Sequence, residues 1–154
     1  MTDRKTIPLL LCRVASCTVG LPLEHVVETM RPLAIEPVSA TGPEFVKGVS
    51  VIRGTPIPVV DAGHLLGGPE TRPGRLVTVR AGNRSVALLF DEVAGIRLVP
   101  TESLQQLPLL LQAAQPDAVA AIGTLDAELL VVLSTACVVP EDLPDYADTT
   151  GVST

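Results

Sequence analysis

One segment, residues 45–61, limits the fold of this chain more than any other, because it combines strand-like alternation with glycine and proline at fixed places. Within it, Val49 and Val51 alternate with Ser50 and Ile52. Alternate residues of a strand point to opposite faces, so these two sets of side chains are expected on opposite sides. The segment therefore predicts a strand that leads into a tight corner and a second strand.

Glycines and prolines set the limits of these two strands. Gly48 and Gly54 bracket the first strand, and glycine there suits either a positive φ or the close approach of another backbone. Pro56 and Pro58 cannot donate to a sheet, so the second strand is expected to lie at an edge or to run irregularly. Arg53, the only charge between the two glycines, is either held by a carboxylate or displayed to a partner.

The rest of the chain shows a similar succession of short apolar runs and turn residues. We expect hairpins from residues 9–14 with 17–23, 75–80 with 85–90 and 118–125 with 128–133, a strand at 93–99, a strand or turn at 24–30, and short helices at 63–66 and 134–139. The run 104–115 contains Pro108 and fits either a helix or an extended segment. About nine or ten short strands without a long amphipathic helix predict an all-β barrel or sandwich.

Length and charge restrict the domain organisation and the kinds of partner. At 154 residues the chain suits one domain or two small intertwined barrels. We expect a frayed terminus at 1–6, a domain at 7–139 and a disordered acidic tail at 140–154, which carries four of the acidic residues and no lysine or arginine. The formal charge is −6, so the rest of the chain carries only −2.

Outside the tail the chain is near neutral, and the whole sequence has two phenylalanines, one tyrosine and no tryptophan, so it lacks the basic footprint and the stacking platforms of a nucleic-acid-binding protein. No apolar run reaches the ~18 residues of a membrane-spanning helix. The stretch that ends at Cys17 has a superficial likeness to a lipoprotein signal, but its apolar part is short and Arg13 interrupts it. We therefore expect neither nucleic-acid binding nor direct insertion into a membrane.

The three cysteines, Cys12, Cys17 and Cys137, are odd in number and irregularly spaced, which argues against a disulfide framework and fits a reducing cytoplasm. Their spacing matches no zinc pattern. Asp61 lies three residues before His64, and such a pair could provide a catalytic base, but no nucleophile motif accompanies them. We expect no catalytic residue, metal or cofactor, and keep a small thiol- or metal-dependent enzyme as the alternative from another functional class.

The order Phe-Val-Lys-Gly-Val, Arg-Gly and Pro-Val-Val-Asp within residues 45–61 resembles the signature of the CheW-like coupling proteins of bacterial chemotaxis. That family usually has asparagine where this chain has Val51, and leucine where it has Ala62. The likeness extends over residues 9–133 and includes three weaker motifs in the family order. These motifs are Val26-Val27-Glu28-Thr29, Phe90-Asp91-Glu92-Val93 followed by Gly95-Ile96, and a terminal hairpin turn at Asp126-Ala127.

The resemblance implies two intertwined five-stranded SH3-like barrels about a shared core, with a few short helical turns. It implies a non-catalytic, cytoplasmic adaptor at receptor clusters, which couples a chemoreceptor tip, held in a groove between the barrels, to the regulatory domain of a CheA-type histidine kinase. The positions tied to receptor contact in the family match Val26, Glu28, Gly48, Arg53 and Gly54. Kinase contact is expected near Val93 and Ile96.

Each of these assignments has a plainer interpretation. Arg53 and Glu28 form either part of a receptor groove or a surface ion pair of little energetic weight. The two glycines either admit a partner helix or serve only as turn residues. The valines either line a groove or fill a core, which is the commoner place for them, and this applies to Val26, Val49 and Val51.

Two further alternatives concern the surface and the number of partners. Arginines at 72, 75, 80 and 84 form either a docking patch for an acidic partner or, as we favour, the solvated face of a hairpin. The departures at Val51, Thr29 and Ala62 motivate a divergent variant that binds the receptor without the kinase and limits array growth.

Overall fold

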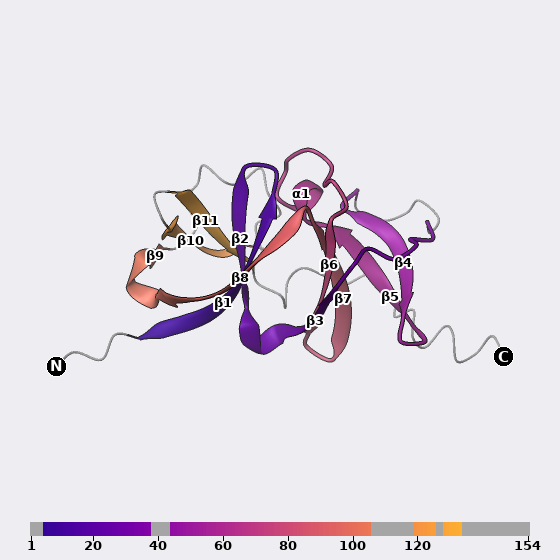
Figure 1. Cartoon of the computed structure of the whole chain (residues 1–154), viewed down its shortest axis with the longest axis horizontal. Helices are drawn as coiled ribbons and strands as arrows, with labels where there is room; N and C mark the ends of the chain where they lie inside the picture. Colours follow the sequence, from indigo (N-terminus) through magenta and orange to yellow (C-terminus); the bar gives the residue numbers. More distant parts are fainter. Residues whose placement is uncertain (1–4, 38–43, 106–118, 126–127, 134–154) are drawn as a thin grey trace.

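The computed structural model describes residues 5–37, 44–105, 119–125 and 128–133 (Figure 1). Within these ranges lie eleven strands: β1 Thr6–Val14, β2 Cys17–Pro22, β3 Val26–Met30, β4 Val46–Ile52, β5 Thr55–Asp61, β6 Arg75–Ala81, β7 Arg84–Phe90, β8 Glu92–Pro100, β9 Leu104–Gln105, β10 Val119–Leu125 and β11 Glu128–Leu133. The helical elements are α1 Ala62–Leu65 and the 3₁₀ turns η1 Leu23–His25 and η2 Thr101–Ser103. Cys137, the helix expected at 134–139, the acidic tail and most of 104–115 lie outside the described residues.

The strands form two sheets that lie side by side in Figure 1. One has the order β8-β1-β2-β11-β10-β9, and the other has the order β3-β6-β7-β5-β4. Each contains one parallel pair, β2 with β11 and β5 with β7, and its other pairs are antiparallel. The predicted all-β fold is therefore confirmed.

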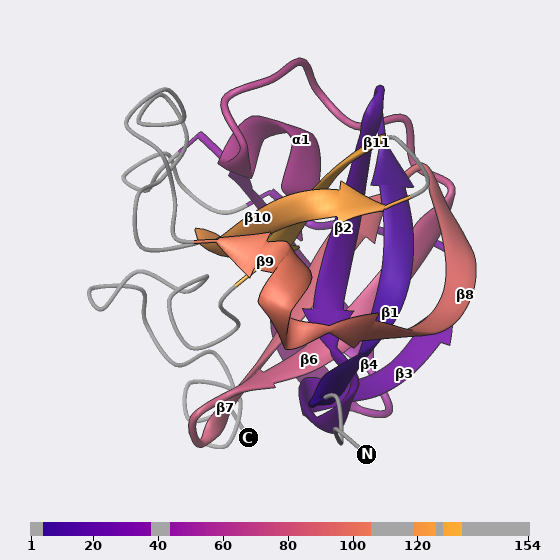
Figure 2. The same cartoon turned by 90° about the vertical axis from the view of Figure 1, so that its left-hand side faces the viewer.

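Each sheet is closed into a barrel by the segment that follows one of its edge strands, β8 in one sheet and β3 in the other. After β8 the chain turns through η2 into β9, which lies beside β10 in Figure 2. Leu104 of β9 pairs with Gly123 of β10. After β3 the chain returns to β4, where Glu36 and Val49 exchange backbone hydrogen bonds of 2.8 and 2.9 Å. Closure hides the strand edges that an open sheet would expose. We call the two units the six-stranded barrel and the five-stranded barrel.

The two barrels share one arrangement of strands. Strand β8 takes the place of β3, the hairpin β1–β2 takes that of β6–β7, and the hairpin β10–β11 takes that of β4–β5. Five consecutive strands from the middle of the chain, β3 to β7, form the five-stranded barrel. The six-stranded barrel combines β1 and β2 with β8 to β11. The chain is therefore intertwined, as the sequence resemblance implied.

Alternating side chains divide the interior into three apolar clusters. Leu9 and Leu11 of β1 fill the six-stranded barrel, whereas Leu10 and Cys12 point into a larger cluster to which both barrels contribute. A third cluster fills the five-stranded barrel and includes Ile52. Strands covered on both faces explain the nearly continuous apolar runs in the sequence.

The expected hairpins at 9–14 with 17–23, 75–80 with 85–90 and 118–125 with 128–133 are confirmed, with ends that differ by a few residues. The expected place of the proline-containing strand is wrong, because β5 lies between β4 and β7. Pro56 and Pro58 are accommodated in its first half, which pairs with β4, while the pairing with β7 begins at Val59. Among the described residues no helix is long and apolar enough to cross a bilayer.

Candidate functional site

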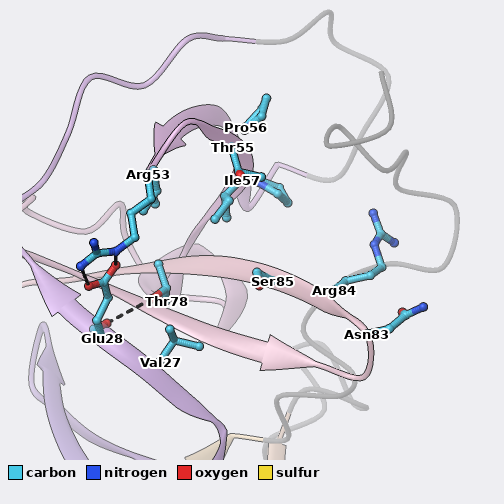
Figure 3. A pocket seen from close by; sticks show the side chains of 12 residues that line it. Val27, Glu28, Arg53, Thr55, Pro56, Ile57, Thr78, Asn83, Arg84 and Ser85 are labelled. Carbon is cyan, nitrogen blue, oxygen red and sulfur yellow. Dashed lines mark hydrogen bonds and ion pairs between the residues drawn. The ribbon is translucent and has the colours of Figure 1, made fainter. Parts of the chain in front are cut away.

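An ion pair joins the strand β3 to the hairpin β4–β5 of the five-stranded barrel. Arg53 donates from Nε to Glu28 Oε1 at 2.9 Å and from Nη2 to Glu28 Oε2 at 2.7 Å (Figure 3). These two hydrogen bonds lower the pKa of the Glu28 carboxyl, against a smaller opposing effect of desolvation, and they raise the pKa of Arg53. Two parallel N–H···O bonds fix the guanidinium plane as well as its position. Of the two alternatives that the sequence left open for Arg53, a carboxylate that holds it or display to a partner, the structure shows the first.

The backbone at the hairpin tip directs Arg53 toward β3. Ile52 pairs with Thr55, so only Arg53 and Gly54 form the loop. Both have positive φ, 52° and 79°, which is the requirement of a type I′ turn. Left-handed backbone is uncommon for a residue other than glycine, asparagine or aspartate. The tight turn and the ion pair together hold Arg53 in this conformation.

A groove of about 320 Å³ lies beside the ion pair (Figure 3). Its lining comes from three elements of the five-stranded barrel: β3, the hairpin β4–β5 and the hairpin β6–β7. The lining residues are Val27, Glu28, Ile52, Arg53, Thr55, Pro56, Ile57, Pro58, Thr78, Asn83, Arg84 and Ser85. The resemblance implied a groove between the barrels, but the groove that contains the Glu28–Arg53 pair belongs to one barrel.

A bulge in β3 decides which of its residues reach this groove. Val26 pairs with Val79 and Glu28 pairs with Thr78, so Val27 is an extra residue on β3. Val27 is exposed and lines the groove with Glu28, whereas Val26 packs half-buried against the shared core. The family resemblance selected Val26 and not Val27, and the sequence motif gives no sign of the bulge that exposes Val27.

The two glycines have different surroundings. Gly48 is buried at φ 147°, and a Cβ there would collide with the carbonyl oxygen of Glu36, so the chain's own backbone makes the close approach. Gly54 has φ 79° and open space where a Cβ would lie. Only Gly54 therefore presents a free surface beside Arg53.

The outward face of β4 is apolar at two positions. Val51 is 59% exposed and Val49 is half-buried, whereas Ser50 and Ile52 point inward. Ser50 is satisfied there, because its hydroxyl donates to the carbonyl oxygen of Ala34 at 2.8 Å. The commoner expectation that an isolated valine is core is therefore wrong for Val51. The predicted separation of Val49 and Val51 from Ser50 and Ile52 is confirmed.

A second exposed apolar surface lies on β8 of the six-stranded barrel. Ile96 and Leu98 are 62% and 65% exposed and alternate along the strand, so they share its outward face. Val93 lies before a bulge at Ala94 and packs against the shared core. Of the two positions expected near the kinase, Ile96 is exposed and Val93 is half-buried. Sequence reasoning missed Leu98, although its spacing of two from Ile96 is the signal that finds it.

The residues considered for catalysis serve the fold in this structure. Asp61 is buried, and its carboxylate accepts from the backbone N–H of His64 at 3.1 Å and from both the N–H and the hydroxyl of Thr71. It thereby caps α1 and holds the following loop. Burial raises the pKa of the Cys12 thiol to about 12. Within the described part of the chain no three His, Cys, Asp or Glu side chains come together as a metal site.

Comparisons with known proteins agree with this geometry. Residues 8–142 match the model of the CheW-like domain family. Protein FrzA of Myxococcus xanthus is 33% identical over 100 residues, a match that covers 63% of this chain and 62% of FrzA, less than two thirds of that protein. The crystal structure of scaffolding protein TtCheW from Thermoanaerobacter tengcongensis has the same fold, with a TM-score of 0.74, 21% identity, and coverage of 84% of this chain and 90% of that one. The chain belongs to the CheW-like domain family.

Proposed function

We propose that this chain is a non-catalytic adaptor that couples the cytoplasmic tip of a chemoreceptor to the regulatory domain of a CheA-type histidine kinase, at receptor clusters on the inner face of the membrane. Membership of the CheW-like family supports the adaptor role. The observation that carries the receptor side is the bidentate Glu28–Arg53 pair on the wall of a groove. The exposed pair Ile96 and Leu98 supports a second binding face on the other barrel.

Arg53 is well placed to contact a receptor while it stays bound to Glu28. Its Nε and one N–H of Nη2 are used by Glu28, and a guanidinium has five N–H donors in all. The side chain is 79% exposed, so the remaining donors face solvent at the mouth of the groove. A carbonyl or carboxylate of the receptor tip can accept from these donors, and Glu28 keeps the fork at a fixed angle.

The remainder of the receptor site is apolar and close to the backbone. Val27 and Ile57 line the groove, and Gly54 leaves open space beside Arg53. A helical hairpin that lays apolar side chains against these residues buries surface worth about 25 cal/mol per Å², less the cost of association. Val26 and Gly48 support this site without lining it. Val26 packs against the shared core, and Gly48 allows the backbone of Glu36 to lie close to β4.

The kinase is proposed to bind the β8 face of the six-stranded barrel. Ile96 and Leu98 provide an apolar centre there, and Val93 supports the strand from the core side. One apolar cluster is shared by the two barrels and joins the receptor groove to the β8 face. A change at the receptor tip then reaches the kinase through the junction between the barrels.

The test is a paired binding measurement with purified receptor-tip and kinase regulatory fragments. Arg53→Glu should abolish receptor binding and leave kinase binding unchanged, while Ile96→Asp should do the reverse. The double variant Glu28→Arg with Arg53→Glu restores an ion pair with the two charges exchanged. It should restore the structure of the groove but not receptor binding. Arg31→Glu, the same charge reversal at an exposed arginine outside the groove lining, is the matched control.

The outcomes separate the proposal from its alternatives. Undiminished receptor binding by Arg53→Glu would refute the assigned groove. Receptor binding by the wild-type chain without any kinase binding would favour the variant that limits array growth. Binding of neither fragment would overturn the adaptor function for this chain.

A further inference from the structure

Asp91 is the single residue between β7 of the five-stranded barrel and β8 of the six-stranded barrel. Its carboxylate accepts two backbone N–H groups from loops that belong to different barrels. Oδ2 accepts from Ala15 at 3.0 Å, in the turn between β1 and β2, and Oδ1 accepts from Arg72 at 3.1 Å, in the loop before β6. One side chain thus connects a turn of each barrel at the point where the chain crosses between them.

The backbone of Asp91 makes connections of the same kind. Its N–H donates to the carbonyl oxygen of Arg13 in β1 at 2.9 Å. Gly74 donates to the carbonyl oxygen of Phe90 at 3.0 Å, and a Cβ on Gly74 would collide with the carbonyl of Asp91. Residues on both sides of the crossing are therefore in direct contact with this one peptide unit.

We propose that Asp91 is a positioning residue that sets the angle between the two barrels. The shared core holds the barrels together, but apolar contact is non-directional and resists separation more than rotation. Hydrogen bonds to a carboxylate are directional and stronger than neutral ones. The two bonds from Ala15 and Arg72 fix a relative orientation that the core alone leaves less defined.

The backbone conformation of Ala15 is a second observation that favours one fixed orientation of the two barrels. Ala15 has φ 54°, a left-handed conformation that is unfavourable for a residue with a Cβ. The bond from its N–H to Asp91 offsets part of that cost only when the barrels are correctly placed. Strand β8 begins at the residue after Asp91, so a change in the angle between the barrels would move the proposed kinase face. That consequence rests on the proposed function, whereas the angle itself can be tested without any partner.

Asp91→Asn is the informative variant, because it keeps the volume but places an amide N–H₂ against one of the two donors. Spin labels at Leu98→Cys and Val51→Cys, one exposed position on each barrel, report the distance between barrels in a chain whose native cysteines are replaced by alanine. Labels at Leu98→Cys and Leu129→Cys, both on the six-stranded barrel, are the control. The expected result is a broader or shifted distribution for the first pair and an unchanged one for the second.

Two results would overturn the proposal: an unchanged distribution for both pairs in folded Asp91→Asn, or equal broadening of both. Amide hydrogen exchange of the wild-type chain provides a measurement that does not depend on a variant folding. Ala15 and Arg72 should show protection and should open together, since they share one acceptor group. Exchange of the Ala15 amide hydrogen at the rate of an unprotected turn amide would contradict its hydrogen bond to Asp91. Failure of receptor or kinase binding in the wild-type chain would affect the proposed function and leave this inference intact.

Discussion

Val26 and Val93 occupy equivalent positions in the two barrels. Each lies directly before a bulged residue, Val27 in β3 and Ala94 in β8, at which the partner strand has one residue fewer. Each packs half-buried against the cluster that both barrels share. The family resemblance assigned one valine to the receptor and the other to the kinase, but their common environment is the connection between the barrels.

This equivalence predicts that the two valines contribute mainly to stability. Val26→Ala and Val93→Ala should each lower the free energy of unfolding by about 1 kcal/mol, because each removes methyl groups that pack against the core. Val27→Ala and Ile96→Ala, at the neighbouring exposed positions, should change it by less than about 0.5 kcal/mol. Urea unfolding measures all four. A stability unaffected at Val26 and Val93, with binding lost, would show that they are contact residues.

The sequence was a good guide to strands and a poorer guide to surfaces. Alternation and turn residues located the hairpins, because one buried face imposes a period of two. A bulge interrupts that period in β3, so Val27 was missed as a surface residue beside Glu28. Leu98 was missed although it keeps the regular spacing of two from Ile96. The position of β5 inside its sheet depended on pairing with a strand more than twenty residues away, which no local pattern encodes.

Glu28 and Arg53 show what the sequence could predict about the site. The lone charge before a Gly turn indicated either a carboxylate that holds it or display to a partner, and the family resemblance pointed to Glu28, which the structure pairs with Arg53. The type I′ turn that aims the arginine and the surrounding groove are properties of three elements together, so they appear only in the folded chain.

The titration of Glu28 should report the ion pair directly. Arg53 holds the pKa of Glu28 below the ordinary glutamate value of 4.5, so the contribution of the pair to stability is present above that value and is lost as the pH falls through the lowered pKa. Between pH 5 and pH 8 this pair should therefore cause no change in stability. Carboxyl NMR should give a midpoint below 4.5 in the wild-type chain and a higher one in Arg53→Ala. Equal midpoints in the two proteins would show that the pair does not persist in solution.

Gly48 and Gly54 should tolerate substitution very differently. Gly48→Ala combines a positive φ with a collision against Glu36, so a loss of at least about 2 kcal/mol of stability is expected. Gly54→Ala meets open space and should cost only the left-handed backbone, about 1 kcal/mol, with a smaller loss for Gly54→Asn. Thermal and urea unfolding of the three variants measure the order. Equal losses for both alanine variants would contradict the close approach of Glu36 to β4.

The reactivity of the cysteines should distinguish a buried structural thiol from a catalytic one. Cys12 lies in the shared core, and its burial raises the thiol pKa to about 12, so almost no thiolate is available near neutral pH. Cys17 is only half-buried at the start of β2 and should be alkylated before Cys12. Native alkylation followed by mass mapping should label Cys17 long before Cys12, and Cys12 should react only when urea unfolds the barrels. Rapid labelling of Cys12 in the folded chain would contradict this burial and would reopen the possibility of thiol chemistry.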